Sequence, residues 1–225
     1  MQTSYEVFQD RSALLEGIER AAGQGYAFVP NAISETMLGE LEAEARGLDF
    51  ELGDHVTAPI NEGSKQQVTQ MHERAYLPIG HHSIPFATLV TDALALQASR
   101  LYARHFELGG WRATEAGYQL YRDPNHHISK HRDRRSDELL AATITIRGAA
   151  RIGIHEAVDD PDDYANTRPI EVFRAAAGTI MFLRAKGLGN GERVIHDVSP
   201  PEEAPRLILN LRMRPDILPA PAETA

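Results

Sequence analysis

The chain has 225 residues, of which 42% are hydrophobic and 24% are charged, a composition typical of a single globular domain. Its formal net charge of −9 argues against a nucleic-acid partner, because phosphate contacts favour a basic surface. The absence of cysteine excludes disulfides, thiolate metal sites and cysteine nucleophiles. We find neither a signal-peptide pattern nor an apolar run of membrane-spanning length, and we therefore expect a cytoplasmic protein without a membrane partner.

The first part of the chain, residues 1–108, is predicted to form a supporting region of helices and a strand. Apolar residues recur at helical spacing over residues 12–22, and the segment GYAFVP at residues 25–30 is typical of a short strand. Ser34 stands where the N-cap of a second helix is expected. The longest helical pattern in the chain covers residues 84–106.

The pattern changes after Gly110, where short β-branched or alternating segments are separated by turn residues. These segments are ATEAGYQLYR, LLAATITIRG, ARIGIHEA, PIEVFRA, GTIMFLRA, ERVIHDV and RLILNLRMR. Spacing of this kind predicts a sandwich or barrel of antiparallel strands over residues 109–214. Residues 215–225, rich in proline and alanine, are predicted to form a loose tail. The expected fold class is therefore mainly β with N-terminal helices, in one domain.

His131 and Asp133 precede the alternating segment LLAATITI and are the first candidates for metal binding. At strand spacing, side chains two residues apart point to the same face, so both could contact one ion. A histidine two residues before an aspartate is a common pair, and Asp133 could instead form an ion pair with a neighbouring arginine. On this pair alone, the ion pair is the favoured interpretation.

His196 supplies a third candidate ligand at the end of a short predicted strand. Two histidines and one carboxylate on a single face form the facial triad that binds non-haem Fe(II) and leaves coordination positions open. The lack of cysteine also removes the thiolate ligands of the usual structural zinc sites. The three residues together therefore favour an iron site.

The segment RLILNLR is predicted to point arginines toward the interior. Arg206, Ile208, Asn210 and Arg212 alternate with three leucines, so the two groups lie on opposite faces of a strand. An inward-facing arginine is costly unless it meets an anion, and a carboxylate ligand is a suitable partner. The pattern thus indicates an acid-binding position close to the candidate metal site.

The order of His131, Asp133, a distal His196 and Arg206 ten residues beyond it resembles the 2-oxoglutarate/Fe(II)-dependent oxygenases. The resemblance covers about residues 117–214, with weaker support from GYAFVPNAISETMLGELEAEA. It implies a double-stranded β-helix (a jelly roll, cupin-like) with helices packed against one sheet.

The resemblance also implies an enzyme, a dioxygenase that uses Fe(II), 2-oxoglutarate and O2. Hydroxylation of a small-molecule substrate would be coupled to decarboxylation of 2-oxoglutarate to succinate. His131, Asp133 and His196 would hold the iron. Arg206 would bind the far carboxylate of 2-oxoglutarate, assisted by residues such as Tyr121 and Gln119. The sequence leaves open whether Arg206 or Arg212 takes that carboxylate.

Two alternatives remain open from the sequence. Two arginines six residues apart with Asn210 between them are similar to the nucleic-acid alkylation-repair branch, although the asparagine is displaced from that branch's pattern. A non-catalytic, cupin-like metal-binding module is the other alternative. Substrate contacts are expected in residues 67–76 and in the acidic loop HEAVDDPDDYANTRP, residues 155–169.

Overall fold

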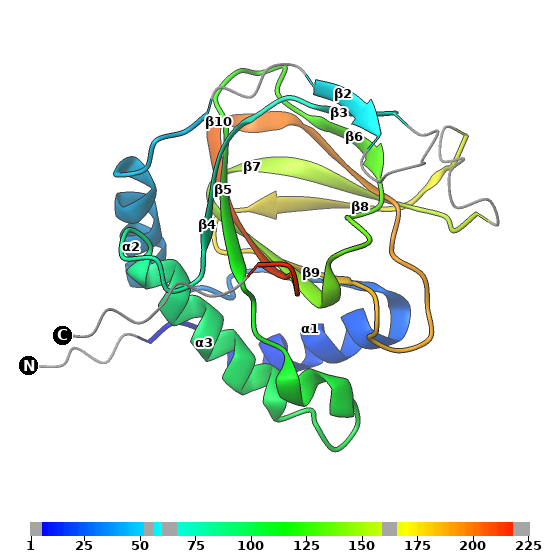
Figure 1. Ribbon diagram of the computed structural model, residues 1–225. Coiled ribbons are helices and arrows are strands. Elements are labelled where there is room, and N and C mark those ends of the chain that lie inside the picture. The colour runs from blue at the N-terminus through cyan, green and yellow to red at the C-terminus, as the bar shows by residue number, and fades with distance from the viewer. Residues whose placement is uncertain (1–5, 52–55, 60–66, 159–165, 218–225) are drawn as a thin grey trace, which may run out of the picture.

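The computed structural model describes residues 6–51, 56–59, 67–158 and 166–217. Three α-helices precede most of the strands: α1 (Arg11–Gln24), α2 (Glu35–Arg46) and α3 (Pro85–Ser99), followed by the 3-10 helix η1 (Phe106–Gly110). The strands are β1 (Tyr26–Val29), β2 (Val56–Pro59), β3 (Gln67–Gln70), β4 (Glu73–Pro78), β5 (Glu115–Tyr121), β6 (Ile128–His131), β7 (Glu138–His155), β8 (Pro169–Ala176), β9 (Ile180–Arg184) and β10 (His196–Met213). Helices gather on one outer side of a curled sheet (Figure 1).

All strand pairs are antiparallel, and the long strands β7 and β10 organise the sheet. The main path of neighbouring strands runs β1-β9-β7-β10-β6-β3-β2. The first half of β7 pairs with β9 and its second half with β8. Similarly, the beginning of β10 pairs with β6, and its later part pairs with β5, which also pairs with β4. Each long strand therefore takes part in both halves of the curled sheet.

The sequence analysis divided each of these long strands into two. The predicted segments at residues 139–148 and 150–157 are one strand in the structure, β7, and ERVIHDV and RLILNLRMR both contribute to β10. Gly148, at the break predicted within β7, has a φ of +75°, and a Cβ there would lie 2.4 Å from the carbonyl oxygen of Glu203. Glycine therefore allows the strand to bend close to β10 and continue.

Two of the three predicted helices begin near the expected residues. Asp10 accepts hydrogen bonds from the amides of Ser12 and Ala13 at the start of α1, and Ser34 accepts one from Met37 at the start of α2. The third prediction, residues 84–106, was too long, because α3 ends at Ser99. The chain then turns, which buries Leu101 and Leu108 in the core.

The molecule has two apolar clusters, one on each face of the curved sheet. The larger contains the buried sides of the helices together with Leu207, Leu209 and Leu211 of β10. The smaller lies on the inner face and contains residues such as Ile152 and Ile208. The alternation predicted for RLILNLR is thus confirmed: its leucines pack toward the helices, and the other residues point inward.

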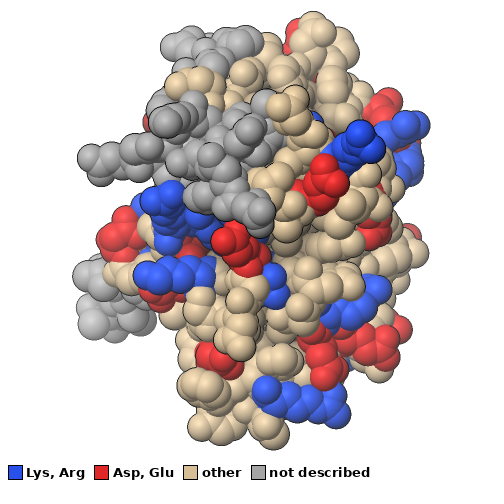
Figure 2. All heavy atoms as spheres, turned by 90° about the vertical axis from the view of Figure 1, so that its right-hand side faces the viewer, with Lys and Arg blue, Asp and Glu red and all other residues tan. Residues whose placement is uncertain are grey.

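The outer surface carries positive and negative side chains side by side on the face turned to the viewer in Figure 2. An exposed cluster joins β7, β8 and β10: Glu202 accepts hydrogen bonds from Arg151 at 2.7 Å and from Arg174 at 2.8 Å, and Arg174 also contacts Glu203 at 2.5 Å. Exposed pairs of this kind contribute little stability. They do neutralise the arginines locally.

The structure confirms a mainly β fold with N-terminal helices. The sequence analysis missed β2, β3, β4 and β6, because these strands are short and polar. β4 pairs with β5, so the N-terminal region adds strands to the sheet as well as helices behind it. Residues 218–225 of the predicted tail lie outside the described residues. No described helix is long and apolar enough to cross a membrane.

Candidate functional site

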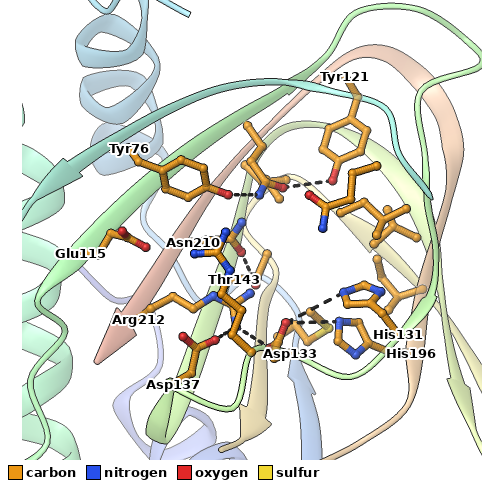
Figure 3. Close-up of a pocket in the computed structure, with 18 of the residues that line it drawn as sticks. Tyr76, Glu115, Tyr121, His131, Asp133, Asp137, Thr143, His196, Asn210 and Arg212 are labelled. Atoms are coloured by element: carbon orange, nitrogen blue, oxygen red, sulfur yellow. Dashed lines mark hydrogen bonds and ion pairs between the residues drawn. The ribbon is translucent and has the colours of Figure 1, made fainter. Parts of the chain in front are cut away.

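A cavity lies inside the curled sheet, lined by inward-facing side chains of β5, β6, β7 and β10 (Figure 3). Its polar lining residues are Gln70, Tyr76, Glu115, Gln119, Tyr121, His131, Asp133, Arg134, Asp137, Thr143, His196, Arg206, Asn210 and Arg212. Its apolar lining residues are Ile128, Ile152, Met181, Val198 and Ile208. The cavity therefore combines several apolar side chains with many ionisable groups, as expected for a ligand site.

His131, Asp133 and His196 come together in this cavity. One potential ligand atom from each residue lies within 4.8 Å of the others, and all three residues are buried. The Nε2 atoms of both histidines are 3.9 Å from Oδ1 of Asp133. His131 is the last residue of β6 and His196 is the first of β10, and these two residues are paired across the strands. The backbone register thus places the two imidazoles side by side.

The backbone fixes the orientation of both imidazoles. Nδ1 of His131 lies 2.8 Å from the carbonyl oxygen of Ser129, and Nδ1 of His196 lies 3.3 Å from that of Val194. With Nδ1 donating to a carbonyl, the lone pair of Nε2 points toward Asp133, which is the arrangement typical of metal-binding histidines. The chemistry of the donor set and its orientation therefore fit a divalent metal ion.

Burial keeps both histidines neutral. It lowers the pKa of His131 to about 3, with a further contribution from His196, and it also lowers the pKa of His196. Burial alone would raise the pKa of Asp133, but Arg212 and the two histidines outweigh it and lower that pKa. Two neutral imidazoles and one carboxylate are the protonation states that a metal ion requires.

Asp133 is held between the histidines and Arg212 (Figure 3). Arg212 donates from Nη1 to Oδ2 of Asp133, and the same atom lies 3.2 Å from Oδ2 of Asp137. The carboxylate oxygen that faces the histidines, Oδ1, is therefore left for another ligand. The sequence analysis considered a neighbouring arginine as the partner of Asp133; the structure shows that the partner comes from β10 instead.

Arg206 lies in the same cavity but has a different environment. Its side chain is buried, and its Nε and Nη1 atoms have no hydrogen-bond partner among the described residues. Nη2 is 3.4 Å from Oγ1 of Thr145, and the guanidinium lies 5.2 Å from the centre of the Tyr121 ring. A buried guanidinium without a carboxylate is costly, so this position is suited to an anionic ligand.

Three polar side chains form a chain of hydrogen bonds across one wall. Gln119 donates to the hydroxyl of Tyr76 at 2.9 Å, and the hydroxyl of Tyr121 donates to Gln119 at 3.1 Å. Gly117 makes room for this arrangement, because a Cβ there would lie 2.1 Å from the Tyr76 ring. Gln119 therefore holds the Tyr121 ring in place beside Arg206.

The structure brings all seven candidate residues of the sequence analysis to one cavity: His131, Asp133, His196, Arg206, Arg212, Tyr121 and Gln119. Of the segment at residues 67–76, Gln70 and Tyr76 line the same cavity. The acidic loop is described only in part, because residues 159–165 lie outside the described residues. The roles assigned to these residues remain predictions.

Sequence reasoning missed Asp137, a buried polar residue of the cavity, and it did not single out the buried His72 within the expected contact segment, residues 67–76. Asp137 lines the cavity six residues after His131, in a stretch that resembles an ordinary charged loop. His72 stacks on Tyr121 with the ring centres 5.3 Å apart, and neither of its ring nitrogens has a partner among the described residues. Only the strand pairing, which is not visible in the sequence, brings them near the other site residues.

His155, a buried histidine at the end of β7, takes part in a different contact. Its Nε2 lies 2.6 Å from Oδ2 of Asp197. Since Asp197 follows His196 on β10, its side chain points to the opposite face of the strand. The His155–Asp197 pair therefore lies behind the cavity wall.

No protein-family model matches the chain, and no curated protein is similar to it in sequence. Solved structures are similar in fold. A prolyl-4-hydroxylase from Pseudomonas putida is 17% identical with a TM-score of 0.58, over 89% of this chain and 98% of that one. A prolyl hydroxylase from Trichoplax adhaerens, solved with a hypoxia-inducible-factor peptide, is 10% identical with a TM-score of 0.59, over 92% of this chain and 91% of that one.

A third similar structure is an oxidoreductase of the 2-oxoglutarate/Fe(II) oxygenase family from Burkholderia pseudomallei. It is 16% identical with a TM-score of 0.54, and the match covers 88% of each chain. Identities this low establish a common fold and leave the activity to be argued from the site. The chain thus has the fold of the 2-oxoglutarate/Fe(II)-dependent oxygenases, which confirms the predicted resemblance at the level of the fold.

Proposed function

We propose that the protein is an Fe(II)- and 2-oxoglutarate-dependent oxygenase that hydroxylates a small molecule. One observation carries this proposal: a cluster of two histidines and one aspartate shares a cavity with a buried arginine that meets no carboxylate of the described residues. The cluster supplies suitable ligands for Fe(II), and the arginine supplies a positive charge for a carboxylate of 2-oxoglutarate. Antiparallel strands curled around the cavity support the interpretation of residues 109–214 as a double-stranded β-helix.

His131, Asp133 and His196 would hold the metal through two Nε2 atoms and one carboxylate oxygen. A bound Fe(II) would supply the oxidation of the substrate by O2, coupled to decarboxylation of 2-oxoglutarate to succinate. The chain's own residues prepare this site. The carbonyls of Ser129 and Val194 orient the imidazoles, and Arg212 holds the second oxygen of Asp133 away from the metal position.

Arg206 is the better candidate for the far carboxylate of 2-oxoglutarate. Arg212 already contacts Asp133 and Asp137, whereas Nε and Nη1 of Arg206 have no hydrogen-bond partner in the part of the chain that the structure describes. A planar guanidinium can donate two parallel hydrogen bonds to a carboxylate. The adjacent Tyr121 ring would shield this pair from water and strengthen it.

Hydroxylation is proposed because two of the similar structures are prolyl hydroxylases by name. A small substrate agrees with the cavity, because inward-facing side chains from several strands line it and limit its space. Nucleic acid as substrate is not supported: positive and negative side chains alternate on the face shown in Figure 2 rather than forming a basic groove. A purely structural metal site would not explain why the buried charge of Arg206 lacks an anionic partner among the described residues.

The test is succinate formation from 2-oxoglutarate, with and without Fe(II), even in the absence of a known substrate. We expect slow, iron-dependent turnover in the wild type and a loss of at least about 100-fold in His131→Ala. The control is His127→Ala, because the His127 ring contacts only the nearby carbonyl of Asn125 among the hydrogen bonds that the structure shows for it. The proposal is wrong if the iron-loaded wild type forms no succinate.

A further inference from the structure

Asp137 carries a buried oxygen that the proposed function does not use. The residue is 2% exposed and lines the cavity. Its Oδ2 accepts a hydrogen bond from Arg212 at 3.2 Å, whereas its Oδ1 is buried and has no partner among the described residues. A buried acceptor without a donor costs about 1–3 kcal/mol, so a ligand that brings a donor to this oxygen would be favoured.

The position of Asp137 relates it to the candidate metal site. Arg212 contacts both Asp133 and Asp137, so the two carboxylates lie on either side of one guanidinium nitrogen. In Figure 3, Asp137 lies on the side of Asp133 away from the two histidines. A group bound at Asp137 would therefore lie beside the metal position without occupying it.

Asp137 also lies away from the proposed cosubstrate position. Arg206 and Arg212 are six residues apart on β10, paired with Tyr121 and Glu115 at the two ends of β5. Six residues of a strand span roughly 20 Å. The far carboxylate of 2-oxoglutarate at Arg206 would thus leave the Asp137 end of the cavity for a second molecule.

The charges at this end favour a cation. Arg212 is shared between two carboxylates, so it compensates the charge of Asp137 only in part. Glu115, the other acidic residue of this wall, already pairs with Arg214 at 3.3 Å. Two further cations act on Asp137: Arg134, an exposed side chain, and Arg214, which already pairs with Glu115 and Asp216. A nitrogen that both donates a hydrogen bond and carries a positive charge matches Oδ1 best.

We propose that Asp137 anchors the substrate by binding a protonated amine through Oδ1, which makes the substrate an amine-bearing small molecule. The inference rests on the proposed function, because binding of the amine by Asp137 would place a neighbouring carbon of the substrate near the metal that oxidises it. Asp137 would position the substrate, and it would neither bind the metal nor contact 2-oxoglutarate.

The test compares two probes of equal length, n-butylammonium and 1-butanol, on the protein loaded with Mn(II) and 2-oxoglutarate. Mn(II) at the triad shortens the proton relaxation times of any molecule held nearby, so weak binding is measurable without turnover. We expect the relaxation enhancement of n-butylammonium to exceed that of 1-butanol at least about fivefold. In Asp137→Asn, which keeps the shape and removes the charge, the enhancement should fall to the level of 1-butanol.

Glu115→Gln is the matched control, because Glu115 lines the same cavity but is already paired. It should keep the amine response of the wild type. Equal responses to the two probes, or a response that survives in Asp137→Asn, would overturn the proposal. If the relaxation of water shows that the triad does not bind Mn(II), the proposed function is contradicted instead. In that case, calorimetric titration of the metal-free proteins with both probes makes the same comparison.

Discussion

The two inward-facing arginines of β10 show how one residue type in one strand acquires two roles. Arg212 contacts the carboxylates of Asp133 and Asp137, and although burial lowers its pKa, these carboxylates outweigh that effect and raise it. Arg206 is buried against Tyr121, two of its nitrogen atoms have no partner among the residues described, and burial lowers its pKa. A buried arginine that is already paired stabilises the fold, whereas a buried arginine without an anionic partner is suited to binding a ligand.

The largest expected effect comes from removing the paired arginine. Arg212→Met leaves two buried carboxylates facing each other, and we expect the free energy of unfolding to fall by about 3–5 kcal/mol. Chemical denaturation of the metal-free protein measures this. Added Mn(II) should recover part of the loss, because the ion compensates Asp133. An unchanged denaturation midpoint would show that the ion pairs contribute nothing.

His72, whose ring stacks on Tyr121, provides a test by acid. Its burial lowers the pKa from 6.5 to about 4, so the unfolded chain binds more protons than the folded one between these values. Stability is therefore present at neutral pH and is lost as the pH falls through this window, by about 3 kcal/mol from this residue. His72→Phe should reduce the loss between pH 7 and pH 4. If the variant and the wild type lose equal stability, His72 is not buried in its neutral form.

Removing Arg206 should lower the affinity for 2-oxoglutarate without lowering stability, in contrast to the removal of Arg212. Arg206→Met takes away a buried charge without breaking an ion pair, so we expect the denaturation midpoint to stay or rise. The affinity for 2-oxoglutarate should fall about 100-fold, or ~2.7 kcal/mol. Calorimetric titration of the metal-loaded variant checks the affinity. A destabilised variant with normal 2-oxoglutarate affinity would reverse the roles assigned to the two arginines.

Between the two arginines, Thr143 and Asn210 form a neutral contact for which we expect the smallest effect. Oγ1 of Thr143 donates to Oδ1 of Asn210 at 2.6 Å, and both residues are buried. Thr143→Val leaves that oxygen without its donor and should cost about 1 kcal/mol of stability. Thermal denaturation measures the loss. A change in 2-oxoglutarate affinity would show that this pair takes part in binding.

The sequence predicted those features of the site that depend on local spacing. The alternation in RLILNLR correctly placed Arg206 and Arg212 on the inner face, because a strand has a fixed period of two. The cluster of His131, Asp133 and His196 does not follow from local spacing, and it was predicted from the donor set and the resemblance to the oxygenases. These inferences needed no knowledge of which strands are neighbours.

Features that depend on the register between distant strands were not predictable. The contact of Arg212 with Asp133 joins residues 79 positions apart, and His72 reaches Tyr121 from a segment without a clear pattern. The continuity of β7 and β10 was also missed, because Gly148 and the prolines of β10 resemble strand ends. Pairing with neighbouring strands overrides these local signals.

The most direct measurement of the central claim is an anaerobic titration of the Fe(II)-loaded protein with 2-oxoglutarate, followed by visible absorption. If the triad holds iron and Arg206 holds the cosubstrate beside it, a charge-transfer band should appear that saturates with 2-oxoglutarate. The band should be absent in His131→Ala and should require about 100-fold more 2-oxoglutarate in Arg206→Met. A wild-type protein that binds Fe(II) and 2-oxoglutarate but shows no such band would contradict the account.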